Sequence, residues 1–531
     1  MIRRQHIITG GLLAVLFGLG WWVGRGGASG DADLYRNLDA FVEVLHKVDQ
    51  NYVDPVDPHR LIEGAIQGML KDLDPYSQYL DSKAFQNLQA TTHGSFGGIG
   101  IVVSVRDNYP TVISPIEGGP AWALGLRSGD VIVRIGARST LGLTVEDVAD
   151  LLRGPAGTRV QITVRREGER GERDVTIERK IIVTRNVPYA FVVGDHVGYL
   201  RLSSFSETSG AEVRTAVARL RAQGAHRLVL DLRSNPGGLL DQAVGVAEQF
   251  LKPNTLVVFT KGRVRGQSNR YVSSEKRPEL DWPLVVLVDR GSASASEIVA
   301  GALQDLDRAL VIGETSFGKG SVQSVFPLRG RSVALKLTTA RYYTPSGRSI
   351  HRAATPPAAL AEDDESDDSE APTPAAPDSA RQTYRTVGGR VVYGGGGIRP
   401  DVVVTPDSLP PLAATVESRG LAFRFANRWV NTHPRWKPSA GLGDSLRRDF
   451  ASFLKAEKVT FGEGELTRQR EPLDRALRRE LARHQLGDSA AARVVLEDDP
   501  VLARALKILG RSRTPREVFA LGAAARPTGA R

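Results

Sequence analysis

The chain has 531 residues, of which 41% are hydrophobic and 24% are charged, and this length predicts several packed domains rather than one. It contains no cysteine, which excludes disulfide bonds, a thiol nucleophile and cysteine-ligated zinc. The net charge is +10, but lysine and arginine are spread over the whole length without a basic run interleaved with aromatic residues, so we expect no nucleic-acid binding.

Residues 1–30 are predicted to be a signal anchor. "MIRRQ" precedes a largely apolar, uncharged run of about 18 residues, and positive charges before such a run predict a cytoplasmic N-terminus and an exported body. The run is long for a signal-peptide core and short for a membrane span. An uncleaved anchor is the favoured interpretation, and cleavage after Ala28 is the alternative. The body lies outside the cytoplasm in both cases.

Residues 31–91 carry apolar side chains in steps of three and four, which predicts a helical segment. Residues 92–182 change to short strands separated by glycines, with one amphipathic helix, "TVEDVADLLRG". The G-x-G loop formed by Gly98, Ile99, Gly100 and Ile101 leads into a strand, so its amides could bind a carboxylate while a peptide adds to the strand edge. The order of loop, "GLRSGDVIVRIG" and helix resembles a PDZ domain.

Strands and helices alternate from residue 183 to 353, which predicts an α/β layered domain with a largely buried sheet. Residues 354–383 are acidic and rich in proline and alanine, so we expect disorder there. Residues 384–410 look like a return to the α/β domain, and residues 411–531 are helical without evident chemistry. Sites in such sheets lie beyond the carboxyl ends of the strands, where "VLDLR" meets "SNPGG" and "PLVVLVD" meets "RGSASASE".

Two kinds of site are disfavoured by the residues. "GETSFGKG" follows a strand as a Walker A loop does, but Gly320 stands where Ser or Thr is needed, and strand-type residues follow where a helix should begin. His226 and His351 lack a context that would recommend them for a catalytic triad, and there is no G-x-S-x-G motif.

A serine–lysine pair fits better. Ser294 and Glu297 form an S-x-x-E capping box, and Lys319, between two glycines, comes 25 residues later. If burial lowers the pKa of Lys319, its neutral amine can accept a serine proton. The amide of Ala295 and one from the "NPGG" turn, Gly237 or Gly238, could hold an oxyanion. Taken singly, a helix-capping serine and an exposed loop lysine are the simpler interpretations.

Five motifs together resemble one family. "GSFGGIGI", "GLRSGDVIVRIG", "LDLRSNPGGLL", "DRGSASASEIVAGALQD" and "GETSFGKGSVQ" occur in the order typical of the carboxyl-terminal processing (tail-specific) proteases, family S41. The resemblance implies that Ser294 is the nucleophile, Lys319 the general base and Gln323 the residue that orients the lysine. It also implies that the PDZ domain captures a free C-terminus and gates the protease, with Arg153 as a relay between the domains.

The resulting prediction is a multidomain α/β protein with an N-terminal helical segment, a PDZ domain, a ClpP/crotonase-like protease core and a helical C-terminal region. The predicted function is a Ser-Lys serine endopeptidase that needs no metal or cofactor and cleaves exported proteins with exposed apolar C-termini. Its expected location is the bacterial inner membrane, with the body in the periplasm, or secreted if the anchor is cleaved. Self-association and an adaptor are both compatible with the resemblance. The alternative is a catalytically silent PDZ protein that only binds peptides.

Overall fold

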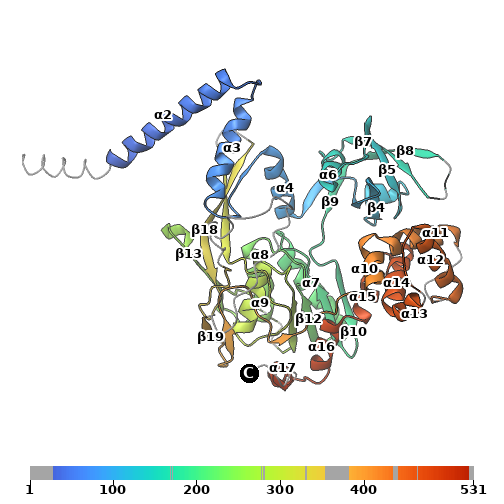
Figure 1. Ribbon diagram of the computed structural model, residues 1–531. Helices are drawn as coiled ribbons and strands as arrows, with labels where there is room; N and C mark the ends of the chain where they lie inside the picture. Colours follow the sequence, from blue (N-terminus) through green and yellow to red (C-terminus); the bar gives the residue numbers. More distant parts are fainter. Residues whose placement is uncertain are drawn as a thin grey trace, which may run out of the picture. The chain divides into compact units, whose positions relative to one another are not determined.

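The computed structural model describes most of the chain (Figure 1). The described residues are 28–167, 169, 171–276, 278, 281–328, 332–352, 382–433, 441–462 and 464–524. Most of the predicted anchor and most of the predicted acidic insert therefore lie outside the described residues. The chain divides into two compact units, one of residues 1–85 with 323–338 and the other of residues 86–322 with 339–531.

The first unit contains the N-terminal helices. They are α2 (Ala28–Asn51) and α3 (Pro58–Lys71). Helix α3 starts at a proline that follows the N-cap residue Asp57, whose side chain accepts a hydrogen bond from the amide of His59. The short strand β1 (Gln78–Leu80) pairs antiparallel with residues 334–336 of strand β18 (Ala334–Tyr343). None of the helices in the described part of the chain is long and apolar enough to cross a membrane.

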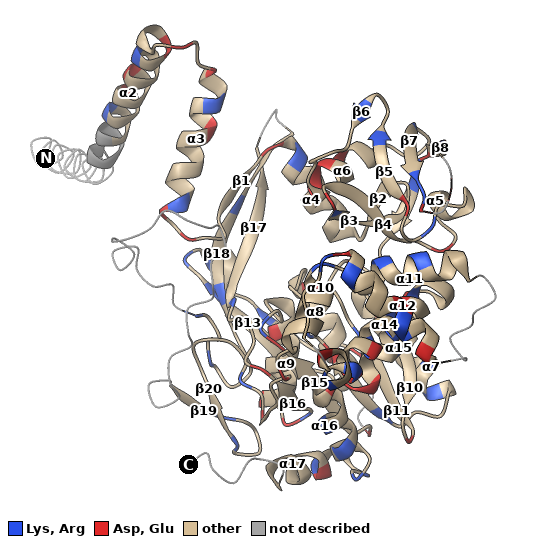
Figure 2. Ribbon diagram, turned by 45° about the vertical axis from the view of Figure 1, so that its right-hand side comes forward, with Lys and Arg blue, Asp and Glu red and all other residues tan. Residues whose placement is uncertain are grey.

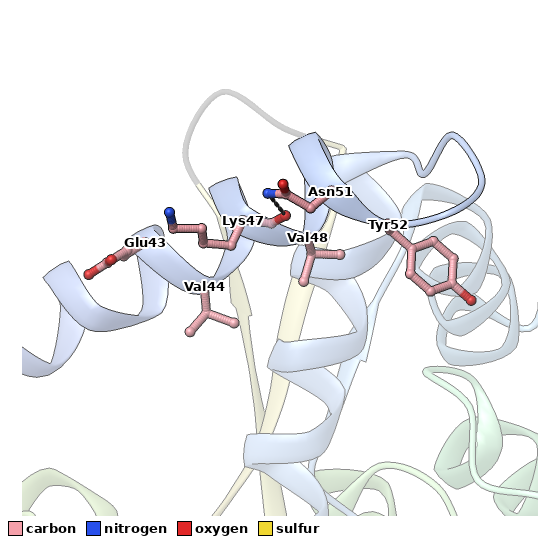
Figure 3. Close-up of a pocket in the computed structure, with 6 residues that line it drawn as sticks. All are labelled: Glu43, Val44, Lys47, Val48, Asn51 and Tyr52. Atoms are coloured by element: carbon pink, nitrogen blue, oxygen red, sulfur yellow. Dashed lines mark hydrogen bonds between the residues drawn. The ribbon is translucent and has the colours of Figure 1, made fainter.

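A shallow hollow runs along α2 (Figure 3). All six side chains that line it come from this helix and the residue after it, namely Glu43, Val44, Lys47, Val48, Asn51 and Tyr52. The side-chain amide of Asn51 donates to the carbonyl of Lys47 at 2.8 Å, so this amide bonds to the helix itself. This surface offers no catalytic constellation.

The predicted PDZ domain lies in the second unit, after helix α4 (Ser82–His93). Its sheet has the order β3-β4-β5-β7-β8, with β6 on β5, while β2 pairs with β9. The strands are β2 (Ser95–Gly98), β3 (Ile101–Arg106), β4 (Tyr109–Pro115), β5 (Val131–Ile135), β6 (Arg138–Ser139), β7 (Arg159–Arg165), β8 (Glu172–Glu178) and β9 (Lys180–Val183). Helices α5 (Pro120–Ala123) and α6 (Val145–Leu152) complete it, and β3 is left as the edge strand beside α6.

The α/β core is built on a six-stranded sheet of order β10-β11-β12-β15-β16-β21. From β11 onward all neighbours are parallel, and only β10 is antiparallel. The strands are β10 (Tyr189–Val193), β11 (Val197–Arg201), β12 (Arg227–Asp231), β15 (Leu284–Val288), β16 (Leu310–Gly313) and β21 (Val402–Val403). The last strand, β21, comes after the predicted insert, so the chain does return to the sheet.

Helices cover both faces of this sheet, which is why its central strands are almost wholly apolar. One face packs against α7 (Ser209–Ala222), α8 (Leu240–Ala247) and α9 (Ala295–Asp305). The other face packs against α16 (Pro500–Leu509) and α17 (Pro515–Ala524) (Figure 1). The last two helices of the C-terminal region therefore belong to the α/β core, which the sequence did not indicate.

Five of the remaining C-terminal helices form a hydrophobic core of their own. They are α10 (Pro411–Ser418), α11 (Leu421–Thr432), α12 (Asp444–Ala456), α13 (Glu465–Arg468) and α14 (Arg470–Leu486). Helix α15 (Asp488–Glu497) contributes no residue to this core, and its Leu496 packs against the cluster that α16 and α17 form with the sheet. Polar contacts join residues 411–497 to the PDZ domain, among them Ser114 to Asp488 at 2.9 Å and Arg106 to the Gly420 carbonyl at 3.1 Å.

Short strands beside the sheet complete the second unit. Strand β13 (Leu256–Gly262) pairs antiparallel with residues 340–343 of β18 and with β14 (Arg270–Val272). A separate hairpin joins β19 (Thr383–Arg385) to β20 (Val391–Tyr393). Its first strand starts at the last residue of the range that we expected to be disordered.

Charges of both signs are interspersed along the described chain (Figure 2). This distribution agrees with the scattered lysines and arginines of the sequence.

A buried ion pair fixes the end of α9. Arg348 lies 2.7 Å from Asp305, both side chains are almost fully buried, and the guanidinium also donates to Gln304 and to the Tyr393 carbonyl. We expect Arg348→Ala to lower the free energy of unfolding by about 3–5 kcal/mol, because it leaves a buried carboxylate without its cation. Urea unfolding of Arg348→Ala, compared with that of the control variant Arg263→Ala, measures this loss. Arg263 is exposed. A loss equal to that of the control would contradict it.

Candidate active site

Ser294 stands in a sharp turn between a strand and a helix. Strand β15 ends at Val288, and α9 begins at Ala295 with Ser294 as its N-cap residue, as predicted. The backbone of Ser294 has φ 54° and ψ −113°, a conformation that residues other than glycine rarely adopt. Strained strand-to-helix turns present the nucleophile in α/β-hydrolases.

The two neighbouring serines have structural partners. Ser292 donates its hydroxyl to the Leu232 carbonyl at 2.8 Å, and Ser296 donates to the Asn235 carbonyl at 2.9 Å. Both are fully buried, whereas Ser294 is partly exposed. These bonds fasten the turn after β12 against the turn that carries Ser294.

The "NPGG" turn approaches Ser294 closely. A Cβ atom on Gly237 would lie 2.8 Å from both the Ala295 nitrogen and the Ser294 Cβ, so only glycine fits there. The Gly237 amide, however, donates to the side-chain oxygen of Asn235 at 2.9 Å. The choice of Gly237 or Gly238 as the second oxyanion donor stays a prediction. Gly238, the alternative named from sequence, is the next amide along.

Lys319 lies in the loop between β16 and β17 (Ser321–Pro327). A Cβ on Gly320 would lie 2.7 Å from the His351 nitrogen, so the glycine allows a close passage of the main chain. The Lys319 side chain is half-buried rather than fully exposed, which disfavours the simple loop-lysine interpretation. Because the loop continues into a strand and not a helix, it lacks the helix N-terminus of a phosphate-binding loop.

Several bonds hold the Lys319 loop to the Ser294 turn. The Phe317 amide donates to the Ser292 carbonyl at 3.0 Å. The carboxylate of Glu297 accepts from the amides of Ser294 at 2.8 Å and Lys319 at 2.9 Å. The two predicted catalytic residues thus lie on adjoining segments that share a partner.

Glu297 is more than the capping glutamate that the sequence predicts. Burial raises the pKa of its carboxyl group, and hydrogen bonds from Ser316, Gly318, Ser294 and Lys319 oppose that rise. The S-x-x-E spacing predicts the bond of Glu297 to Ser294, but it does not predict the bonds of Glu297 to the loop that carries Lys319. Tyr342, which also contacts this region, carried no signal in the sequence.

Gln323 belongs to the first unit, where its side-chain amide donates to the Thr338 hydroxyl at 3.3 Å. Thr338 in turn donates to Asp74 at 3.1 Å. The expected role of Gln323 in orienting Lys319 stays a prediction.

The predicted carboxylate loop lies at the start of the PDZ edge strand. Gly100 has φ 73°, which favours glycine, and its carbonyl accepts from the Ile116 amide at 2.9 Å. Ile99 is buried, and its carbonyl accepts from the Ala121 amide at 3.0 Å. These bonds fix the loop beside β3, where a peptide can add as a further strand.

Arg153 ends helix α6. Its guanidinium donates to Asn87 on α4 at 2.8 Å and lies over the Phe96 ring at 4.7 Å. Arg153 therefore joins the PDZ domain to the segment that precedes it, while its predicted part in gating stays untested.

Three family models match the chain. They are peptidase family S41 over residues 196–359, a PDZ domain over residues 111–166 and the activating protease CtpB N-terminal domain over residues 26–84.

Similar proteins carry related names. A carboxy-terminal-processing protease of Bartonella bacilliformis is 43% identical over 324 residues, which is 60% of this chain and 74% of the relative. The carboxy-terminal processing protease CtpA of Bacillus subtilis is 35% identical over 326 residues, 61% of this chain and 69% of the relative. Among solved structures, a photosystem II D1 C-terminal processing protease is similar at 29% identity and a TM-score of 0.36, covering 70% of this chain and 93% of that one. The chain belongs to the carboxy-terminal processing proteases of peptidase family S41, and it is a serine-type peptidase.

Proposed function

We propose that the protein is an exported endopeptidase that recognises the free apolar C-terminus of a protein substrate through its PDZ domain and cleaves the chain with Ser294 and Lys319. The observation that carries this proposal is the strained turn at Ser294, joined through Glu297 to the loop of Lys319. The names of the relatives, which are carboxy-terminal processing proteases, support the substrate class. A catalytically silent PDZ protein is disfavoured because it would not need this constellation.

In the proposed cycle, the neutral amine of Lys319 takes the proton of the Ser294 hydroxyl as the hydroxyl oxygen attacks a peptide carbonyl. The amides of Ala295 and Gly237, with Gly238 as the alternative to Gly237, hold the oxyanion that forms. The peptide C–N bond then breaks, the leaving amine takes the proton from Lys319, and an ester remains on Ser294. Water, deprotonated by Lys319, cleaves that ester and restores the serine.

The export of the body is part of the proposal, since residues 1–30 have the charge and apolar pattern of a signal anchor. We propose a bacterial inner-membrane location with the catalytic body in the periplasm. Protease digestion of spheroplasts tests this, because an exposed body is degraded and a cytoplasmic one is protected.

Tail recognition predicts a dependence on the substrate's terminal carboxylate. An unfolded substrate with an apolar C-terminus is expected to be cleaved with a kcat/KM at least about 10-fold higher than the same substrate with an amidated C-terminus, since one charge-assisted contact is worth about 1.5–3 kcal/mol. Steady-state cleavage of the two peptides measures the ratio, and fluorescence anisotropy on Ser294→Ala measures binding alone. Equal kcat/KM values for the two peptides would show that the protein does not recognise the terminal carboxylate.

A further inference from the structure

The main chains at Ser294 and Lys319 are held by the same two buried side chains. The Oε2 atom of Glu297 accepts from the Ser294 amide at 2.8 Å and from the Lys319 amide at 2.9 Å. The hydroxyl of Tyr342 is shared between the carbonyl oxygen of Ser294, at 3.1 Å, and that of Lys319. Each of the two residues therefore has its N–H bound by Glu297 and its C=O bound by Tyr342.

The bonds of Glu297 exceed what a helix cap requires. A capping glutamate needs only the bond to the N-cap amide, here that of Ser294. The other oxygen, Oε1, accepts from the Ser316 hydroxyl at 2.5 Å and from the Gly318 amide at 2.7 Å. Because Glu297 is only 1% exposed, its carboxylate depends on these donors in place of water. Three of its four bonds therefore serve the loop that carries Lys319.

Tyr342 reaches the same place from a different element. It lies in β18, is 1% exposed, and its amide donates to the Gly320 carbonyl at 3.0 Å. The Ser294 carbonyl also accepts from the amides of Glu297 at 2.9 Å and Ile298 at 3.0 Å. The Ser294 carbonyl therefore has hydrogen-bond donors within the helix and does not need the tyrosine hydroxyl. The contribution of that hydroxyl is to link the two segments.

We propose that Glu297 and Tyr342 are positioning residues of the peptidase, which set the separation between Ser294 and Lys319 by holding the main chain of both. The inference rests on the proposed roles of Ser294 and Lys319. Neither Glu297 nor Tyr342 takes a proton in the cycle. Their effect is to keep the lysine amine within reach of the serine hydroxyl, since a misplacement of about 1 Å in an active site costs about 10²-fold in rate.

Tyr342→Phe in the full chain is the test, because it removes one hydroxyl and keeps the ring. We expect kcat for an unfolded tail substrate to fall about 10- to 100-fold with an unchanged KM. We expect the melting temperature to fall by no more than about 4 °C. A purely structural role would lower activity only in step with the folded fraction, so it would leave the kcat of the folded enzyme unchanged.

The matched control is Tyr343→Phe, one residue along the same strand. Tyr343 stacks on Phe259 at 5.2 Å and lies under the Lys261 amine, so its loss should leave kcat as in wild type. Glu297→Gln is the second variant. It replaces one of the two carboxylate oxygens, both of which accept from N–H donors, with an amide nitrogen, which cannot accept. We expect its kcat to fall at least as far as that of Tyr342→Phe.

The outcomes separate this inference from the function on which it rests. If Ser294→Ala and Lys319→Ala are inactive while Tyr342→Phe and Glu297→Gln have the kcat of wild type, the positioning role is wrong and the Ser-Lys assignment stands. If Ser294→Ala or Lys319→Ala retains full activity, the assignment itself is wrong. A kcat loss in Tyr343→Phe as large as in Tyr342→Phe would also overturn the positioning role.

Discussion

Replacing Ser294 with alanine is expected to abolish cleavage, with kcat lower by about 10⁶-fold, as when the nucleophile of a serine protease is removed. The hydroxyl oxygen is the atom that forms the ester, and neither Ser292 nor Ser296 can replace it because their hydroxyls bond to the carbonyls of Leu232 and Asn235. Release of a fluorophore from an internally quenched unfolded substrate measures the effect.

Ser296→Ala is the control for this prediction, since it makes the same serine-to-alanine change two residues further along the chain. We expect it to lose about 1 kcal/mol of stability through the bond to Asn235 while keeping most of its cleavage activity. If Ser294→Ala cleaved as fast as wild type, the nucleophile would have to be another residue.

Replacing Lys319 with alanine is the second large expected effect. We expect kcat to fall by about 10²–10⁴-fold, the contribution of a general base. Only the neutral amine accepts a proton, so the activity of the wild type should rise as the pH rises through the pKa of Lys319 and should be lost below it. That dependence should be absent from the residual activity of Lys319→Ala.

A pH profile of kcat for wild type, Lys319→Ala and Lys261→Ala makes this comparison. Lys261 lies over the rings of Phe259 and Tyr343, and its removal should leave the profile unchanged. If the kcat of Lys319→Ala rose with pH as that of wild type does, a different group would cause the rise and Lys319 would not be the general base.

The core of the fold could be predicted from the sequence because its signals are local. Apolar runs such as those of β12 and β15 end at glycine- and serine-rich turns, and α9 begins at Ser294 where the S-x-x-E spacing indicates a cap. The capping box and the lysine between two glycines identified the two segments that the structure brings together.

The rest depended on contacts between residues far apart in the chain. Tyr342 lies 48 residues from Ser294 in sequence, and no local pattern distinguishes its hydroxyl from that of Tyr343. The hydrogen bond from the Gly237 amide to Asn235 depends on the conformation of the turn, so no sequence pattern predicts it. The packing of α16 and α17 on the sheet likewise could not be inferred from two amphipathic helices at the end of the chain.

The central claim, that Ser294 forms the acyl-enzyme, is tested most directly by trapping that intermediate. The full-length protein is mixed with an activated ester of a short peptide with an apolar C-terminus, quenched in acid within the first turnover, digested and mapped by mass spectrometry. We predict an acyl adduct on the peptide that contains Ser294 and none on this peptide from Ser294→Ala. An adduct on a different residue, in an enzyme that turns the ester over at the normal rate, would contradict the account.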